Sequence, residues 1–132
     1  MSITHTETGI LLEGVCLTDG PDMNGEVVDL AGVDLSGIVG DGLFPLTAEF
    51  DDTHIVGWAR VRQTGDGKAI HASATMLRRA DPPPSLDRMY LAPAGIVLER
   101  DGQTVKRLKL TGIGVVAQHA DPNVPPIGEG PR

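Results

Sequence analysis

Two alternating segments around a tight turn decide the fold: HIVGWARVRQ (residues 54–63), TGDG (64–67) and KAIHASATML (68–77). An Asp-Gly pair between segments of alternating apolar and polar residues is a strong signal for a β-hairpin. Because side chains alternate between the two faces of a strand, one face of the hairpin is predicted to be buried. The predicted buried positions are Ile55, Gly57, Ala59, Val61, Ile70, Ala72, Ala74 and Met76.

Apolar segments on either side of this hairpin predict further strands. They lie at residues 9–17, 26–30, 43–50, 89–99 and 104–118, and turn formers or irregular stretches separate them. No segment shows the sustained 3.6-residue periodicity of an amphipathic helix. Gly and Pro, at 17 and 10 of 132 residues, are too frequent for a helical bundle. We therefore expect a mainly β chain, folded as a single compact β-barrel with few or short helices.

Two Pro-rich segments stand apart from the predicted strands. Three consecutive prolines predict an extended, exposed loop over residues 78–88. The Pro- and Gly-rich residues 121–132 predict an extended arm beyond a barrel domain of residues 1–120. We expect this arm to be mobile in the isolated domain and ordered only on a partner. The predicted partner-binding residues are Val124, Pro125, Pro126, Ile127, Pro82, Pro83 and Pro84.

The charge of the chain is negative and unevenly distributed. A formal net charge of −7 argues against nucleic acid as a partner, and only four aromatic residues are available to stack on bases. Residues 1–59 carry eleven carboxylates and no Lys or Arg, whereas residues 60–132 carry seven carboxylates and all eleven basic residues. Either the two halves neutralise each other within one barrel, or an acidic and a basic face meet between subunits.

The single cysteine and the N-terminal sequence indicate the cellular compartment in which the chain is expected. Cys16 is alone, so no internal disulfide is expected, and a reducing compartment fits. The first residues, MSITH, have neither the basic nor the apolar region of a secretion signal. No apolar run approaches the roughly 18 residues of a membrane span. We therefore expect neither secretion nor membrane insertion.

The residues that carry chemistry form no standard motif. The spacings of the four histidines match no metal-ligand pattern, so we expect no metal and no other cofactor. Ser73 and His71 share the polar face of one predicted strand and could form a nucleophile and its base. The plainer interpretation of this pair is a solvated strand face.

Several segments, taken in order, match a pattern of one family. They are DMNGEVV (22–28), GVDLS (32–36), LTAEFD (46–51), VGWA (56–59), LAPAGIVLE (91–99) and GVVAQHADP (114–122). In this order and spacing the chain resembles the tailed-phage prohead proteases, which mature capsids. The resemblance covers roughly residues 9–125, and it implies a prohead-protease-like barrel.

The departures from the family pattern bear on activity. By this resemblance the catalytic histidine of the family falls on Phe50 and the nucleophilic serine on Ala92. Phenylalanine cannot accept a proton and alanine has no hydroxyl group, so both chemical roles are lost. Pro93 also lacks a backbone N–H that could help to stabilise an oxyanion. The resemblance therefore implies a shortened relative without catalytic activity.

A structural role on the virion follows from this interpretation. We expect a capsid decoration, cement or minor capsid protein, made in the host cytoplasm, that binds the major capsid protein of a tailed phage and forms a homo-oligomer. Two alternatives stay open. One is an active maturation protease that uses Ser73 with His71 or His54, and the other is a β-barrel binding module unrelated to phage.

Overall fold

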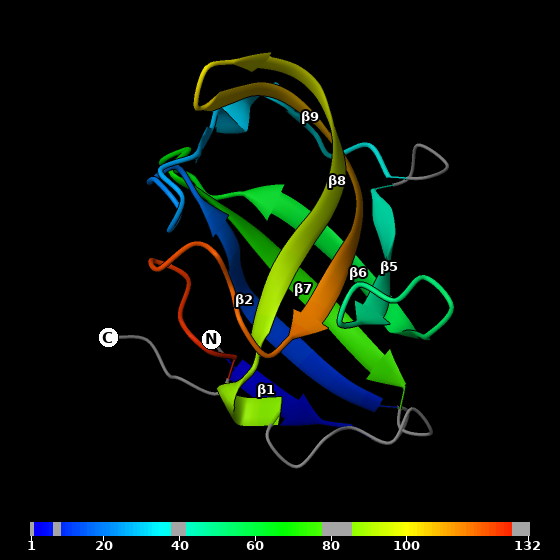
Figure 1. Cartoon of the computed structure of the whole chain (residues 1–132). Coiled ribbons are helices and arrows are strands. Elements are labelled where there is room, and N and C mark those ends of the chain that lie inside the picture. Colours follow the sequence, from blue (N-terminus) through cyan, green and yellow to red (C-terminus); the bar gives the residue numbers. More distant parts are fainter. Residues whose placement is uncertain (1, 7–8, 38–41, 78–85, 128–132) are drawn as a thin grey trace.

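The computed structural model in Figure 1 describes residues 2–6, 9–37, 42–77 and 86–127, and β-strands dominate them. Two short 3₁₀ turns, η1 (Leu30–Gly32) and η3 (Leu86–Arg88), are the helical elements of this part of the chain. The prediction of a mainly β fold is therefore confirmed. The strands are β1 (Ser2–His5), β2 (Gly9–Thr18), β3 (Val27–Val28), β4 (Val33–Asp34), β5 (Leu43–Ala48), β6 (Ile55–Gln63), β7 (Ala69–Leu77), β8 (Tyr90–Asp101) and β9 (Thr104–Val116).

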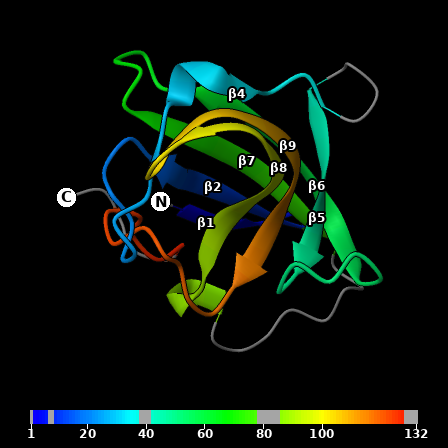
Figure 2. The same ribbon diagram turned by 45° about the horizontal axis from the view of Figure 1, so that its top comes forward.

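The strands form one sheet that folds back on itself. Its order is β1-β2-β7-β6-β5-β9-β3, and β4 and β8 also pair with β9. Figures 1 and 2 show β8 and β9 crossing in front of β2 and β7. Apolar side chains of β2, β7, β8 and β9 form one buried cluster. No helix in the described ranges is long and apolar enough to cross a membrane.

The expected closure into a barrel is wrong. β8 packs against β2, but no hydrogen-bonded ladder joins these two strands in the described part of the chain. A bulge at Cys16 interrupts β2, and side chains that follow β9 bind backbone groups of β2 instead. His119 Nε2 lies 2.7 Å from the carbonyl oxygen of Cys16, and Asp121 accepts a hydrogen bond from the N–H of Thr18. Side-chain contacts thus replace the ladder that would close a barrel.

The hairpin of β6 and β7 matches the sequence prediction except at one end. Seven of the eight expected positions are buried or half-buried, whereas Ile55 is half-exposed and Val56 is buried in its place. The register between β5 and β6 shifts at this point, because Leu46 pairs with Gly57 and Thr47 pairs with Ile55. The extra residue, Val56, reverses the alternation of faces.

The core lies between the two layers of the folded sheet. Its largest fully buried side chains come from β2, β5, β7, β8 and β9, and Ile127 adds one from beyond the last strand. They include Leu12, Phe44, Leu46, Ile70, Leu91 and Ile113. Because the two layers share this core, the sheet behaves as one packing unit.

The predicted mobile arm is also wrong for residues 121–127. Val124 and Ile127 are buried in the core of their own chain, and Pro125 and Pro126 are half-buried. The N–H of Ile127 donates to the carbonyl of Met89 over 2.8 Å. Two aliphatic side chains and one buried carboxylate suffice to hold the segment on the domain, which its Pro-rich composition did not suggest. Pro82, Pro83, Pro84 and residues 128–132 lie outside the described residues.

Candidate functional site

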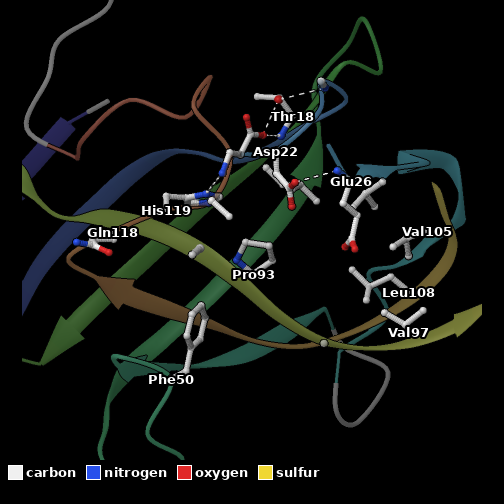
Figure 3. Close-up of a pocket in the computed structure, with 17 residues that line it drawn as sticks. Thr18, Asp22, Glu26, Phe50, Pro93, Val97, Val105, Leu108, Gln118 and His119 are labelled. Carbon is white, nitrogen blue, oxygen red and sulfur yellow. Dashed lines mark hydrogen bonds between the residues drawn. The ribbon is translucent and has the colours of Figure 1, made fainter. Parts of the chain in front are cut away.

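A cavity of about 320 Å³ opens beside β8, where the sheet fails to close (Figure 3). It lies between β8, the end of β2 with the turn that follows, and residues 118–121 after β9. Its apolar lining comes mainly from Leu17, Val28, Phe50, Ala92, Pro93, Val97, Val105 and Leu108. Its polar lining comes from Thr18, Asp22, Glu26, Gln118, His119 and Asp121.

Phe50 enters this cavity from an unusual backbone conformation. Glu49 and Phe50, directly after β5, have φ angles of 52° and 62°, in the left-handed region that non-glycine residues seldom occupy. Hydrogen bonds hold the turn on β9: Glu49 N–H donates to the carbonyl of Val115, and Ala117 N–H donates to Glu49 Oε1. The turn places the Phe50 ring over Gly114, where an added Cβ would lie 2.7 Å from two ring carbons.

Ala92, on β8, lies opposite the same point of β9. It is buried in β8, and its register partner on β9 is Gly114, the residue that the Phe50 ring covers. The two positions that the resemblance assigns to a catalytic dyad therefore meet at one glycine, although 42 residues separate them in the sequence. Neither side chain there can donate, accept or transfer a proton.

A buried polar network anchors the opposite wall of the cavity. Asp121 is 3% exposed, and its Oδ2 accepts hydrogen bonds from the N–H and the hydroxyl group of Thr18, at 2.9 and 2.6 Å. Its Oδ1 accepts the N–H of Asn123, so both carboxylate oxygens accept hydrogen bonds. The backbone N–H of Asp121 donates to Nδ1 of His119. His119 therefore carries its proton on Nε2, which donates to the carbonyl of Cys16.

The rim of the cavity is acidic. Asp22 Oδ1 accepts the N–H groups of Asn24 and Glu26 within its own turn, which fixes that carboxylate at the rim. Glu26 forms an ion pair with Arg100 of β8 at 2.8 Å, and both side chains are partly exposed. An apolar floor with carboxylates at its edge can bind a ligand.

Ser73 and His71 lie on the outer face of β7, away from the cavity lining. No hydrogen bond joins the two side chains in the described structure. Across the strands Ser73 faces Glu13 and Arg60, and His71 faces Val15 and Arg62. Partial burial, and then the charge of Arg62, lower the pKa of His71, while Glu13 opposes this shift. Without a hydrogen bond between the two side chains, His71 is not placed as a base for the hydroxyl group of Ser73 in this structure.

His54 does not reach Ser73 either. It precedes β6, whereas Ser73 pairs with Arg60, six residues further along that strand. At about 3.3 Å per residue, the two positions lie roughly 20 Å apart.

Three further features of the sequence remain, namely possible metal ligands, the single cysteine and the predicted partner-binding residues. Within the described residues no three His, Cys, Asp or Glu side chains gather as metal ligands. The thiol of Cys16 is fully buried, and this desolvation raises its pKa to about 12. Of the residues expected to bind a partner, Val124 and Ile127 are buried and are therefore unavailable to one, whereas Pro125 and Pro126 are half-buried.

Sequence reasoning missed the network of Thr18, His119 and Asp121. Its partners are 103 residues apart in the chain, and neither end carries a motif that points to the other. The Asp-Pro-Asn sequence at residues 121–123 signals a turn, but only the fold shows which strand the carboxylate reaches.

Comparison of the chain with protein-family models, with curated proteins and with solved structures finds no match.

Proposed function

We propose that this chain is a structural protein of a tailed-phage virion, a capsid decoration, cement or minor capsid protein without protease activity. One observation carries the proposal: Phe50 and Ala92 meet at Gly114 and line the same cavity. A resemblance that arose by chance would have no reason to place these two positions together. If the resemblance is correct, the chain keeps the geometry of the site and lacks its chemistry.

The arrangement of the other candidate groups supports a non-enzymatic role. The serine and histidine of the alternative pair are half-buried on the outer face of β7, and the described structure has no hydrogen bond between them. The cavity instead offers an apolar surface with an acidic rim, which suits binding better than bond cleavage. In this proposal the partner is the major capsid protein, and the site of action is the capsid.

Retention on capsid shells tests the proposal directly. The full chain is mixed with empty shells of the major capsid protein from the same genome, and the shells are sedimented. We expect the chain to sediment with the shells and to leave the capsid protein uncut on a denaturing gel. The same chain mixed with shells of an unrelated phage is the control for non-specific co-sedimentation.

Cleavage of the capsid protein would instead support the protease alternative. In that case a serine-directed phosphonate probe would label the wild type and not the Ser73→Ala variant. We expect no labelling of either protein. A chain that neither sediments with the shells nor cleaves the capsid protein would support a binding module unrelated to capsids and would end the proposal.

A further inference from the structure

The interior of the cavity beside β8 is apolar. Leu17, Ala92 and Val105 form its buried floor and are 9%, 5% and 1% exposed. Pro93 and Leu108, which are half-buried, extend this apolar surface. The volume of about 320 Å³ lies at the lower end of the roughly 300–1,000 Å³ range of small-molecule sites. The cavity is therefore of a size for the apolar part of a small molecule.

The polar groups on the wall of the cavity are already paired within the chain. The carboxylate of Asp121 accepts three hydrogen bonds, two of them from Thr18. Both ring nitrogens of His119 are engaged with backbone groups. Among the described residues no buried side-chain nitrogen or oxygen lacks a hydrogen-bond partner. A polar group that entered the cavity would lose its water and find no free partner, so the part of a ligand that enters must be apolar.

One carboxylate at the mouth of the cavity has no positive partner. Glu26 is paired with Arg100, whereas no Lys, Arg or His of the described chain lies within ion-pair distance of Asp22. Asp22 Oδ1 accepts the N–H groups of Asn24 and Glu26, which fixes the carboxylate in place. Asp22 Oδ2 accepts no hydrogen bond from the described residues and is left for a donor from outside. The mouth therefore favours a positively charged donor.

We propose that this cavity binds a small amphiphilic amine, whose apolar chain enters the cavity and whose ammonium group stays at the mouth beside Asp22. An ammonium group there can donate to Asp22 Oδ2 and keep part of its hydration, so its charge is not buried. The ring of Phe50, which is 43% exposed, lies on the other side of Pro93 from Asp22 in Figure 3 and lines the path of the chain. The inference does not depend on the proposed virion role.

The position of the charge favours a free amine over a lysine side chain of a protein. A lysine side chain enters a cavity with its ammonium group first, which would bury the charge against Leu17, Ala92 and Val105. A free amine can enter with its apolar end first. An anionic ligand of the same shape would place its charge beside Asp22 and Glu26, and like charges repel.

Titration of the full chain with matched probes, followed by the NMR signals of the backbone amides, tests the inference. Hexylamine, 1-hexanol and hexanoate share one apolar chain and differ in charge. We expect the dissociation constant of hexylamine to be roughly threefold or more below that of hexanol, and roughly tenfold or more below that of hexanoate. N-acetyl-lysine methylamide, which represents a lysine side chain, is expected to bind roughly tenfold or more weakly than hexylamine.

Two pairs of variants separate the charge from the shape of the site. Asp22→Asn keeps the oxygen that holds the turn and removes the charge, so the preference for hexylamine over hexanol should disappear. Asp34→Asn is its control, because Asp34 Oδ1 also accepts the N–H two residues further on but does not line the cavity. Val97→Lys adds a positive charge to the lining and should make hexanoate the better ligand. Leu98→Lys, at the next residue and outside the lining, should keep the order of the wild type.

Circular dichroism checks that each variant is folded, and Asp22→Asn decides alone if Val97→Lys does not fold. The inference is overturned if hexylamine shifts no amide signals of the residues that line the cavity. It is also overturned if hexanol, hexanoate or the lysine derivative binds as tightly as hexylamine, or if Asp22→Asn keeps the preference of the wild type. Retention on capsid shells is measured separately, so failure of either proposal leaves the other standing.

Discussion

At the scale of single residues, the carboxylate of Asp121 fixes the segment after β9 on the end of β2. It is buried, and it accepts two hydrogen bonds from Thr18 and one from Asn123. A buried group of this kind stabilises the fold mainly because the cost of leaving its partners unsatisfied is high.

Asp121→Asn tests this role with a minimal change of shape. An amide presents one oxygen instead of two, so it cannot accept from Thr18 and Asn123 together. We expect the free energy of unfolding to fall by about 1–3 kcal/mol, measured by urea denaturation. Asp66→Asn is the matched control, because Asp66 Oδ1 also accepts a hydroxyl and an N–H hydrogen bond but is exposed. Equal losses in both variants would show that burial of Asp121 contributes nothing.

His71 predicts a dependence of stability on pH. Desolvation and then the charge of Arg62 lower its pKa in the folded chain, so the neutral form is favoured there. As the pH falls below the ordinary value of 6.5, the unfolded chain takes up the proton more readily than the folded chain. The stability contributed by neutral His71 is therefore complete above pH 6.5 and is lost as the pH falls through the lowered pKa.

The comparison of wild type with His71→Gln isolates this effect from the other titrating groups. Unfolding free energies at pH 7.5 and 5.5 are measured for both proteins. The wild type is expected to lose more stability between these values than the variant does. The same loss in both proteins would assign the pH dependence to other groups.

At the scale of elements, the close approach of β6 and β7 depends on Gly57. A Cβ at this position would lie 1.8 Å from the carbonyl oxygen of Thr75 on the neighbouring strand. That oxygen is part of the backbone and cannot move aside as a side chain would. Gly65, in the turn between the same two strands, has no atom within 4 Å of an added Cβ and no positive φ angle.

Gly57→Ala and Gly65→Ala therefore make a matched pair. The first is expected to lower the free energy of unfolding by about 3 kcal/mol or more, because the two strands must separate locally. The second is expected to leave it within about 0.5 kcal/mol of the wild type. Thermal and urea unfolding of the three proteins give these values. A mild effect of Gly57→Ala would mean that β6 lies further from β7 than the structure shows.

The same elements show how far the sequence predicts the fold. The alternation of apolar and polar residues and the Asp-Gly turn predict β6 and β7, because both signals come from residues that are close together in the sequence. The bulges at Val56 and Cys16 are not predicted, since an extra residue in a strand becomes visible only against its partner. Phe50 and Ala92 were found only through a resemblance, and the wall of the cavity formed by His119 and Asp121 was not predicted. Contacts across 103 residues leave no local pattern.

At the scale of the whole molecule, the two differently charged parts of the chain interleave. β3 and β4 come from the acidic part and pair in parallel with β9 of the basic part. Glu26 pairs with Arg100, and Lys109 adds to the effect of the Ser36 hydrogen bonds in lowering the pKa of Asp34. Part of the charge asymmetry is therefore balanced inside one chain. For the charges that remain exposed, we expect binding to capsid shells to weaken as the salt concentration rises, because salt screens such charges.

The packing of residues 121–127 determines whether the chain folds as one unit or as a domain with an extended arm. Removing residues after Ala120 would delete the buried side chains of Val124 and Ile127 and the carboxylate of Asp121. It would also delete the N–H that orients His119 towards Cys16. Burial of each aliphatic side chain is worth about 1.5–3 kcal/mol, a large share of the roughly 5–15 kcal/mol that stabilises a domain.

Truncation after Ala120 is therefore expected to unfold the chain or to lower its melting temperature by roughly 10 °C or more, at about 3–5 °C per kcal/mol for a domain of this size. Circular dichroism gives the melting temperature. Labelling with a thiol reagent gives a second readout, because Cys16 is fully buried with a raised pKa and should react only after the cavity wall opens. Asn123→Ala, an exposed side chain in the same segment, is the control and should match the wild type in both measurements. A truncated chain that melts within a few degrees of the wild type and keeps Cys16 unreactive would show that the segment is an arm after all.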